Sequence, residues 1–369
     1  MKKSFSKLKA VLFGLFLGLL LCEILLRIYN PFPFALQKGR LILPANQHKV
    51  FVNRWISKLD RHIRYSRNSL GFRGPEPPDS LWRLLSIVTV GGSTTECKFL
   101  SDSCTWPSRL DELLRPGHPD LWINNAGMDG HSTYGHLLLL REYLVRLRPR
   151  YILFLTGIND VETDRPDEFD LMNDNRLNTH SVKSFLKSLL NHTELGRTAF
   201  HFYLVEQAYK KGLIHREVRP GDLRVEPLAD SIVQARLAAQ KPYLAGYRAR
   251  VDSLISLCRQ AGIQPIFITQ PSLYGDYTDP VSGLAMGDRW LRDDPRPNNC
   301  RLEGLVLDQY NAVLRSLAPA VPVIDLAARM PKNPAYYYDF IHFTNEGARE
   351  VASLLADQLR PLIFTNPAP

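Results

Sequence analysis

Residues 87–96 read Ile87-Val88-Thr89-Val90-Gly91-Gly92-Ser93-Thr94-Thr95-Glu96, and this stretch indicates the fold of the chain. Its first four residues are apolar or β-branched, which is typical of a short buried strand in a parallel sheet. The two glycines that follow allow a sharp turn at the carboxyl end of that strand. Open α/β sheets bind their ligands at this end. Ser93 therefore stands where a nucleophile would lie, although Gly-Gly-Ser by itself is more often a plain turn.

The residues around Ser93 fit none of three better-known motifs. The spacing Gly-x-x-x-x-Gly-Lys of a phosphate-binding loop is missing, and so is the Gly-x-Gly-x-x-Gly of a dinucleotide-binding turn. The α/β-hydrolase pattern Gly-x-Ser-x-Gly requires a glycine where Thr95 stands. The rest of the chain must therefore show whether Ser93 is catalytic.

The composition is that of an ordinary globular protein, because 45% of the 369 residues are hydrophobic and 22% are charged. This length suffices for one large domain with a membrane segment, or for two modest domains. The net charge is +9, but lysine and arginine are scattered and no block of them occurs. A solvated basic surface is favoured over nucleic-acid binding, and no nucleic-acid partner is expected.

The amino terminus carries the pattern of a membrane anchor. Residues 10–29 are almost wholly apolar, and a helix needs roughly 20 residues to cross a bilayer. Four lysines within the first nine residues favour a cytoplasmic amino terminus, with everything after residue 30 outside. Glu23 and Arg27 lie one helical turn apart and are predicted to pair. No small-x-small site follows promptly, which favours an uncleaved anchor over a cleaved signal peptide. A lipoprotein signal at Cys22 is disfavoured by the large Leu21 before it.

Under this topology the other cysteines lie in an oxidising compartment, and they are Cys97, Cys104, Cys258 and Cys300. Cys97 with Cys104 is a candidate for a short-loop disulfide, and the connectivity is otherwise open.

After residue 80, predicted strands and helices alternate, which predicts a parallel sheet covered by helices on both faces. Besides the strand that ends at Val90, strands are predicted at Leu121–Asn125, Tyr151–Leu155, Pro265–Thr269 and Val321–Asp325. Helices are predicted at Pro107–Leu114, Tyr134–Leu147, Tyr243–Ala261, Leu302–Leu317 and Asn345–Leu359. The looser stretch 161–230, with helical pieces at Val182–Leu190 and Thr198–Tyr209, is interpreted as an insertion over the carboxyl end of the sheet.

Three parts of the chain are thus predicted. Residues 1–30 form the anchor, residues 31–80 form a linker and packing segment, and residues 81–369 form the domain that carries Ser93.

Four further residues in polar clusters follow predicted strands, as Ser93 does. They are Gly130, Asn159, Asp339 and His342. Loops at one end of a parallel sheet converge, so these residues can share one site. A serine hydroxyl becomes a nucleophile when a neutral imidazole takes its proton and a carboxylate orients that imidazole. His342 and Asp339 can serve these roles, and Gly130 and Asn159 can donate to an oxyanion.

Each of these residues also has a structural interpretation. Gly-x-Asn-Asp is usually a turn, and Asp-x-x-His can cap the helix that follows. Asn125 and Gly127 are interpreted as shaping the turn after the second strand. His131 and His136 lack metal-ligand partners and are expected to be solvent or core histidines, and not zinc ligands.

Taken in order along the chain, four segments of this sequence resemble the conserved motifs of the SGNH (GDSL-type) hydrolase family. The matching segments are Gly91–Thr95, Asn125–Gly130, Gly157–Asp160 and Asp339–His342. The resemblance implies a flavodoxin-like three-layer α/β/α fold with about five parallel strands and no obligatory cofactor. It implies Ser93 as nucleophile, Asp339 and His342 as the rest of the triad, and Gly130 and Asn159 as oxyanion donors. The start Gly91-Gly92-Ser93 departs from the usual Gly-Asp-Ser and, like Asn68–Arg73, is similar to membrane-anchored bacterial members.

The sequence therefore predicts a membrane-anchored, extracytoplasmic serine esterase that cleaves small acyl esters of a carbohydrate or lipid, with O-acetyl groups of a polysaccharide as one candidate. Two alternatives stay open. An O-acyltransferase would pass the same acyl group to a sugar hydroxyl, and a non-catalytic envelope protein would only bind or scaffold.

Overall fold

The computed structural model describes residues 2–29, 36–37, 40–41, 43–79, 84–164, 193–196, 198–199, 202, 215–292 and 294–364. The chain forms two compact units. The first comprises Met1–Ile42 and Met172–Ile214, and the second comprises Leu43–Leu171 and His215–Pro369.

The first unit contains the long helix α1 (Lys2–Ile28) and the two-residue strands β1 (Leu36–Gln37) and β2 (Arg40–Leu41). Its segment Lys9–Ile28 is long and apolar enough to cross a membrane, a property that signal sequences share. The predicted pair is confirmed, because Arg27 Nε lies 2.7 Å from Glu23 Oε1. The Glu23 carboxylate also accepts the backbone N–H groups of Glu194 at 3.1 Å and Leu195 at 3.0 Å.

The second unit is built on a five-stranded sheet in which every neighbouring pair is parallel, in the order β11-β9-β7-β5-β6. The strands are β5 (Leu85–Gly91), β6 (Leu121–Asn125), β7 (Tyr151–Thr156), β9 (Gln264–Thr269) and β11 (Val323–Ile324). Every residue of β5, β6 and β7 is buried, as expected for strands that are covered on both faces. The predicted flavodoxin-like fold is confirmed. Because β5 lies between β6 and β7, the strand order reverses beside it, which is where open sheets bind ligands.

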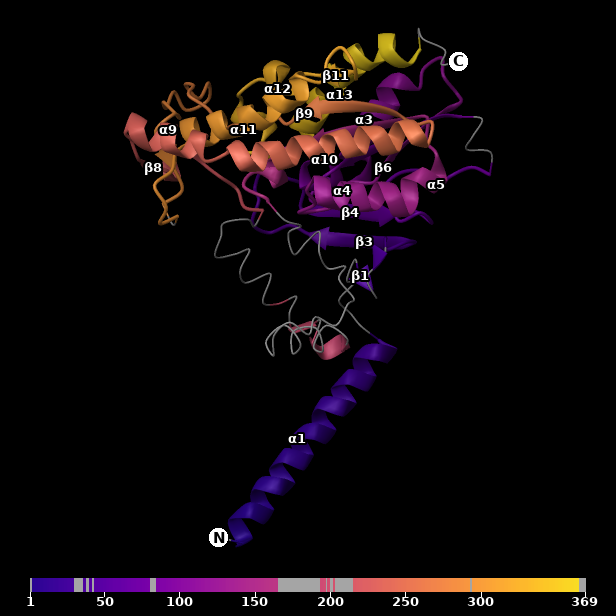
Figure 1. Ribbon diagram of the computed structural model, residues 1–369, viewed down its shortest axis with the longest axis vertical. Coiled ribbons are helices and arrows are strands. Elements are labelled where there is room, and N and C mark those ends of the chain that lie inside the picture. Colours follow the sequence, from indigo (N-terminus) through magenta and orange to yellow (C-terminus); the bar gives the residue numbers. More distant parts are fainter. Residues whose placement is uncertain are drawn as a thin grey trace. The chain divides into compact units, whose positions relative to one another are not determined.

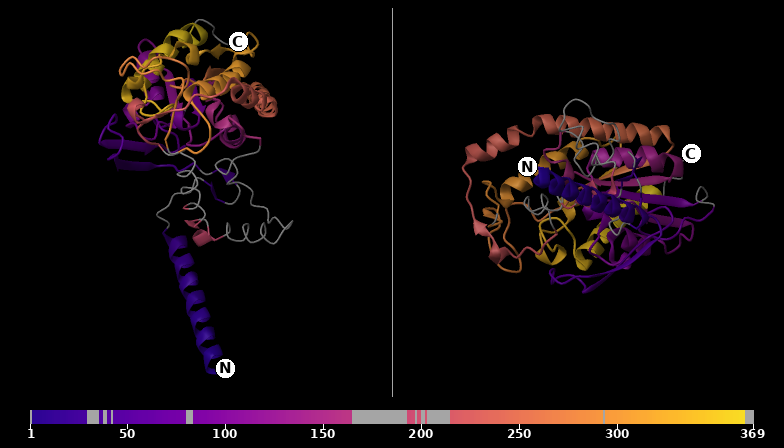
Figure 2. Two further views of the ribbon diagram at one scale, coloured as in Figure 1. Left: turned by 90° about the vertical axis from the view of Figure 1, so that its left-hand side faces the viewer. Right: turned by 90° about the horizontal axis from the view of Figure 1, so that it is seen from below.

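Helices cover both faces of this sheet (Figures 1 and 2). On one face α3 (Trp106–Leu114) packs against α13 (Asn345–Ile363), and their buried side chains join those of the sheet in one apolar cluster. On the other face α4 (Thr133–Leu139) and α11 (Cys300–Arg315) pack against α10 (Lys241–Gln260). The predicted helix Tyr134–Leu147 consists of α4, a π-helical turn at Leu140–Leu144 and α5 (Val145–Leu147).

The remaining elements of the described part of the chain are short. They are α2 (Ser93–Glu96), β8 (Arg224–Val225), α9 (Asp230–Ala238), β10 (Arg289–Trp290), α12 (Leu326–Arg329) and single 3₁₀ turns at Asp102–Cys104, Ile158–Asp160, Pro220–Asp222 and Pro334–Tyr336. The predicted helix Val182–Leu190 and most of Thr198–Tyr209 lie outside the described residues.

An antiparallel hairpin that the sequence pattern does not predict precedes the sheet. Its strands are β3 (Gln47–Val52) and β4 (His62–Arg67), and it lies beside the sheet in Figure 2. The buried positions of β4 are Ile63, Tyr65 and Arg67. A half-buried strand is recognised by alternating apolar and polar residues, and Arg67 breaks this pattern because it is a charged residue at a buried position.

The suggested disulfide between Cys97 and Cys104 is wrong, because all five cysteines are free. The buried Cys97 thiol points at its own turn, with Sγ 3.3 Å from the carbonyl oxygen of Thr94. Cys104 Sγ lies 3.9 Å from a guanidinium nitrogen of Arg109. Two cysteines seven positions apart satisfy the spacing for a disulfide, but the turn between them directs their side chains to different neighbours.

Candidate active site

Ser93 is the first residue of α2, directly after the turn that ends β5. Both glycines of this turn have close neighbours where a Cβ atom would stand. A Cβ atom on Gly91 would overlap the Thr95 side chain, and one on Gly92 would overlap the side-chain nitrogen of Asn159. A side chain at position 92 would have to displace the Asn159 amide. Ser93 is 7% exposed, so its hydroxyl is held in a largely enclosed position.

The structure brings Ser93, His342 and Asp339 into one hydrogen-bonded chain. Ser93 Oγ lies 2.8 Å from His342 Nε2, and His342 Nδ1 lies 2.6 Å from Asp339 Oδ2. The other carboxylate oxygen of Asp339 accepts the backbone N–H groups of Ile341 at 2.8 Å and His342 at 2.7 Å. Burial alone would raise the pKa of Asp339, but the charge of His342 and these hydrogen bonds hold that pKa below its ordinary value.

Neither Asp339 nor His342 caps the last helix. That role belongs to Thr344, whose Oγ1 accepts the backbone N–H of Gly347 at 3.1 Å. The structural interpretation of the Asp-x-x-His segment as a helix cap is therefore wrong.

Asn159 and Gly130 lie in loops that contact the Ser93 turn. The Asn159 amide, in the turn after β7, lies against Gly92 and donates to the backbone carbonyl of His131 at 3.0 Å. Its second N–H can serve another acceptor. Gly130 precedes His131 and has a φ of +75°, a conformation that favours glycine. The backbone N–H of Asp129, the residue before Gly130, donates to the Glu96 carboxylate at 2.7 Å.

Asn125 and Gly127 shape the turn after β6, as interpreted from the sequence. Asn125 Oδ1 accepts the N–H of Gly127 at 2.9 Å, and Asn125 Nδ2 donates to the carbonyl of Thr95 at 2.7 Å. A Cβ atom on Gly127 would overlap the backbone of Glu96. These contacts fix the loop that carries Gly130 against α2.

His215 is a neighbour of the site that the sequence does not reveal. Its ring centroid lies 4.1 Å from that of His342, and its Nδ1 lies 2.6 Å from the Tyr338 hydroxyl. Its Nε2 lies 3.5 Å from an oxygen of Asp129. Burial would lower the pKa of His215, but Asp129 and Asp339 raise it above the ordinary value. A lone histidine after a long insertion carries no motif, so only the fold brings it here.

Among the described residues, His215, Asp339 and His342 form the one group that could hold a metal ion, with ligand atoms within 4.8 Å of one another. Asp339 and His342 already use such atoms for each other and for Ser93. A metal bound there would have to break these bonds, so the donor set does not fit a resident metal. His131 and His136 are both buried and do not belong to this group.

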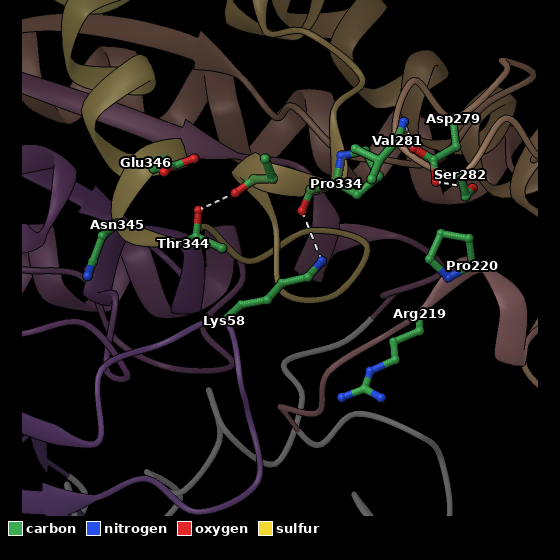
Figure 3. Close-up of a pocket in the computed structure, with 11 residues that line it drawn as sticks. Lys58, Arg219, Pro220, Asp279, Val281, Ser282, Pro334, Thr344, Asn345 and Glu346 are labelled. Carbon is green, nitrogen blue, oxygen red and sulfur yellow. Dashed lines mark hydrogen bonds between the residues drawn. The ribbon is translucent and has the colours of Figure 1, made fainter.

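A hollow of about 490 Å³ opens nearby on the second unit (Figure 3). It is lined by residues that include Lys58, Arg219, Pro334, Thr344 and Glu346. None of the five predicted site residues lines it. The hollow therefore does not define the catalytic site, although its wall includes residues on either side of the segment that carries Asp339 and His342.

Several known proteins are similar to this chain. The model of the GDSL-like Lipase/Acylhydrolase family matches residues 89–350. The solved structure of Axe2, an acetylxylan esterase from Geobacillus stearothermophilus, is 16% identical with a TM-score of 0.40 and covers 75% of this chain and 93% of that one. A GDSL-like lipase from Bacteroides thetaiotaomicron is 13% identical with a TM-score of 0.40, over 78% of this chain and 93% of that one. The sequence matches none of the curated proteins with which it was compared.

The family match spans more than half of the chain and contains the segments of all five predicted site residues. The resemblance inferred from the motifs is thereby confirmed, and the chain belongs to the GDSL-like lipase/acylhydrolase family of ester-hydrolysing enzymes.

Proposed function

We propose that this protein is a serine esterase in which Ser93, His342 and Asp339 form the catalytic triad. The observation that carries this proposal is the chain of two short hydrogen bonds, 2.8 Å from Ser93 Oγ to His342 Nε2 and 2.6 Å from His342 Nδ1 to Asp339 Oδ2. His342 takes the proton of Ser93 as the hydroxyl attacks the ester carbonyl, and it returns that proton to the departing alcohol. Asp339 orients the imidazole and stabilises its cation. Water activated by His342 then hydrolyses the acyl-enzyme.

The backbone N–H groups of Ser93 and Gly130 and the amide of Asn159 form the proposed oxyanion hole. Support comes from the contact of the Asn159 amide with Gly92, next to the nucleophile, and from its bond to the carbonyl of His131, next to Gly130. Donors fixed in this way stabilise the negative charge of the tetrahedral intermediate without reorganising.

The proposed substrates are small acyl esters of a carbohydrate or lipid, with O-acetyl groups as the leading candidate. A short acyl group suits a serine that is only 7% exposed. The proposed location is outside the cytoplasm, with the domain anchored by Lys9–Ile28. Three lysines before this segment and Lys9 at its start support that orientation.

Labelling by a serine-directed fluorophosphonate tests the triad. The full chain is expected to be labelled on Ser93, and Ser93→Ala is expected to lose the label while it stays folded by circular dichroism. A folded wild-type chain that takes no label would contradict the catalytic proposal and favour a binding or scaffolding protein.

Mass analysis of the products separates hydrolysis from acyl transfer. The enzyme is incubated with an acetyl ester, with and without an oligosaccharide acceptor. An esterase releases acetate in both reactions, and the acceptor mass is unchanged. An increase of one acetyl group in the acceptor mass, with Ser93→Ala as the negative control, would identify an O-acyltransferase instead.

A further inference from the structure

The segment from Asn53 to Arg73 contacts the loops that carry the proposed catalytic residues, although it precedes the family-matched region 89–350. We call this segment the hairpin brace. It contains the loop between β3 and β4, the strand β4 and the turn that follows it. Its contacts reach two sides of the active site.

On the nucleophile side the brace binds Glu96, the last residue of α2. The Glu96 side chain is 6% exposed, and its Oε1 accepts the Tyr65 hydroxyl at 2.7 Å and Arg67 Nη2 at 2.6 Å. Its other oxygen accepts the backbone N–H of Asp129, which precedes Gly130. One buried carboxylate thus joins the brace, the nucleophile helix and the loop of the proposed oxyanion donor. The Glu96 carboxylate is charged and buried, so losing any one of its three hydrogen-bond donors would be costly. This cost keeps the three donors and the carboxylate in fixed positions.

Arg73 holds the backbone at the same end of this helix. Its guanidinium is buried and donates to the backbone carbonyls of Glu96 at 2.7 Å, Cys97 at 2.8 Å and Leu100 at 2.9 Å. These are carbonyls at and beyond the carboxyl end of α2, where a cation is favoured. The Arg73 backbone also exchanges two hydrogen bonds with Asn125, at 2.9 and 3.0 Å. The turn after β6 is therefore tied to the brace as well.

On the acid–base side the brace binds the segment that carries Asp339 and His342. Lys58, between β3 and β4, donates from Nζ to the carbonyls of Pro334 and Tyr337, each at 2.9 Å (Figure 3 shows the bond to Pro334). Asp60 accepts from Asn345 Nδ2 at 3.0 Å. The two contacts lie on either side of Asp339 and His342 in the sequence.

We propose that the hairpin brace is a positioning element of the active site, in which Lys58 and Tyr65 hold the acid–base loop and the nucleophile turn at the separation needed for proton transfer. The inference rests on the proposed triad. Neither residue contacts the reacting atoms, and each acts through another group: Lys58 through the backbone before Asp339, and Tyr65 through Glu96. Misplacement of about 1 Å can cost roughly 100-fold in rate, so a modest shift of either loop is measurable.

The test is the turnover number per active site of the full-length enzyme, with sites counted by fluorophosphonate titration. Lys58→Met removes two hydrogen bonds from a half-buried side chain and keeps most of its apolar length. Its kcat per titrated site is expected to fall roughly 10- to 100-fold with KM little changed. Lys58→Arg, which retains a cationic donor, is expected to recover part of the rate. Tyr65→Phe tests the nucleophile side and is expected to lower kcat per site in the same manner.

Lys49→Met is the matched control, because Lys49 is a half-buried lysine of the same hairpin whose side chain makes no hydrogen bond or ion pair among the described residues. It is expected to leave kcat per site unchanged. A purely structural role for Lys58 would reduce the number of titrated sites and leave kcat per site at the wild-type value, and that result would overturn the positioning role alone. Absence of labelling in the wild-type chain would overturn the proposed triad and this inference together.

Discussion

Gly92 is the residue whose missing side chain leaves room for the Asn159 amide. Gly92→Ala tests this contact, because its φ of −83° is negative and the added methyl group points at the Asn159 amide. Because the added methyl group would overlap only the end of a flexible side chain at its closest contact, we expect the fold to persist and the amide to be displaced. The value of kcat for ester hydrolysis should fall about 100- to 1,000-fold, as when one oxyanion donor is lost.

Gly221→Ala is the matched control for this change, since a Cβ atom there meets nothing within 4 Å. Steady-state kinetics and thermal unfolding of both variants provide the measurement. Wild-type kcat in a folded Gly92→Ala enzyme would exclude Asn159 as an oxyanion donor.

His136, in α4, makes stability depend on pH. Burial and then the neighbouring His131 lower the pKa of His136 to about 3. The unfolded chain binds a proton at the ordinary value of about 6.5, whereas the folded chain does not until the pH approaches 3. The contribution of His136 to stability is therefore complete above pH 6.5 and is lost as the pH falls toward 3. Denaturant unfolding at a series of pH values should show that the free energy of unfolding falls less steeply with decreasing pH in His136→Gln than in the wild type. Parallel curves would contradict this assignment.

At the scale of elements, Arg250 joins α10 to α4 and to the turn after β7. Its Nε donates to Thr133 Oγ1 at 2.6 Å, and its Nη2 lies 3.2 Å from Asp160 Oδ1. Asp160 is 1% exposed, and burial raises its pKa to about 6 despite these donors. Arg250→Met would leave this carboxyl group buried without its cation. We expect a loss of about 3–5 kcal/mol in the free energy of unfolding at pH 7.

The matched control for Arg250 is on the same helix. Arg248 pairs with Asp252 at 3.0 Å, and both side chains are about half exposed. Arg248→Met should change the free energy of unfolding by less than about 1 kcal/mol, because solvent screens the pair. Equal effects of the two changes in urea unfolding would show that Arg250 makes no special connection between the elements.

At the scale of the whole molecule, Lys9–Ile28 is expected to retain the protein in the membrane. Full-length protein should stay with the membrane fraction after an alkaline wash. Replacing Leu17 and Leu20 with arginine should release it, since each charge near the middle of a span costs about 2.5–3.5 kcal/mol on the insertion scale. Replacement of the same residues with alanine is the control. An intact mass that lacks the first residues would instead identify a cleaved signal sequence.

The sequence by itself determined the parallel α/β core and the candidate residues. Both are local patterns. Apolar runs of strand length form the buried strands of a parallel sheet. Residues that directly follow such runs lie at the carboxyl ends of the strands, where open sheets bind ligands, and here they are glycine, serine, asparagine and the Asp-x-x-His segment. The bounds of β6 and the start of α13 were predicted to the residue for this reason.

Only the tertiary structure decided which distant groups complete and support the site. The sequence does not show that Tyr65, Arg67 and Glu96 are buried partners, because each looks like an ordinary surface residue. A charged group can be buried only when another part of the chain supplies its hydrogen-bonding partners, and only the fold brings these parts together. His215 and Lys58 likewise reach the site from segments that carry no motif. The free thiols of Cys97 and Cys104 follow from the directions of their side chains, which spacing along the chain does not specify.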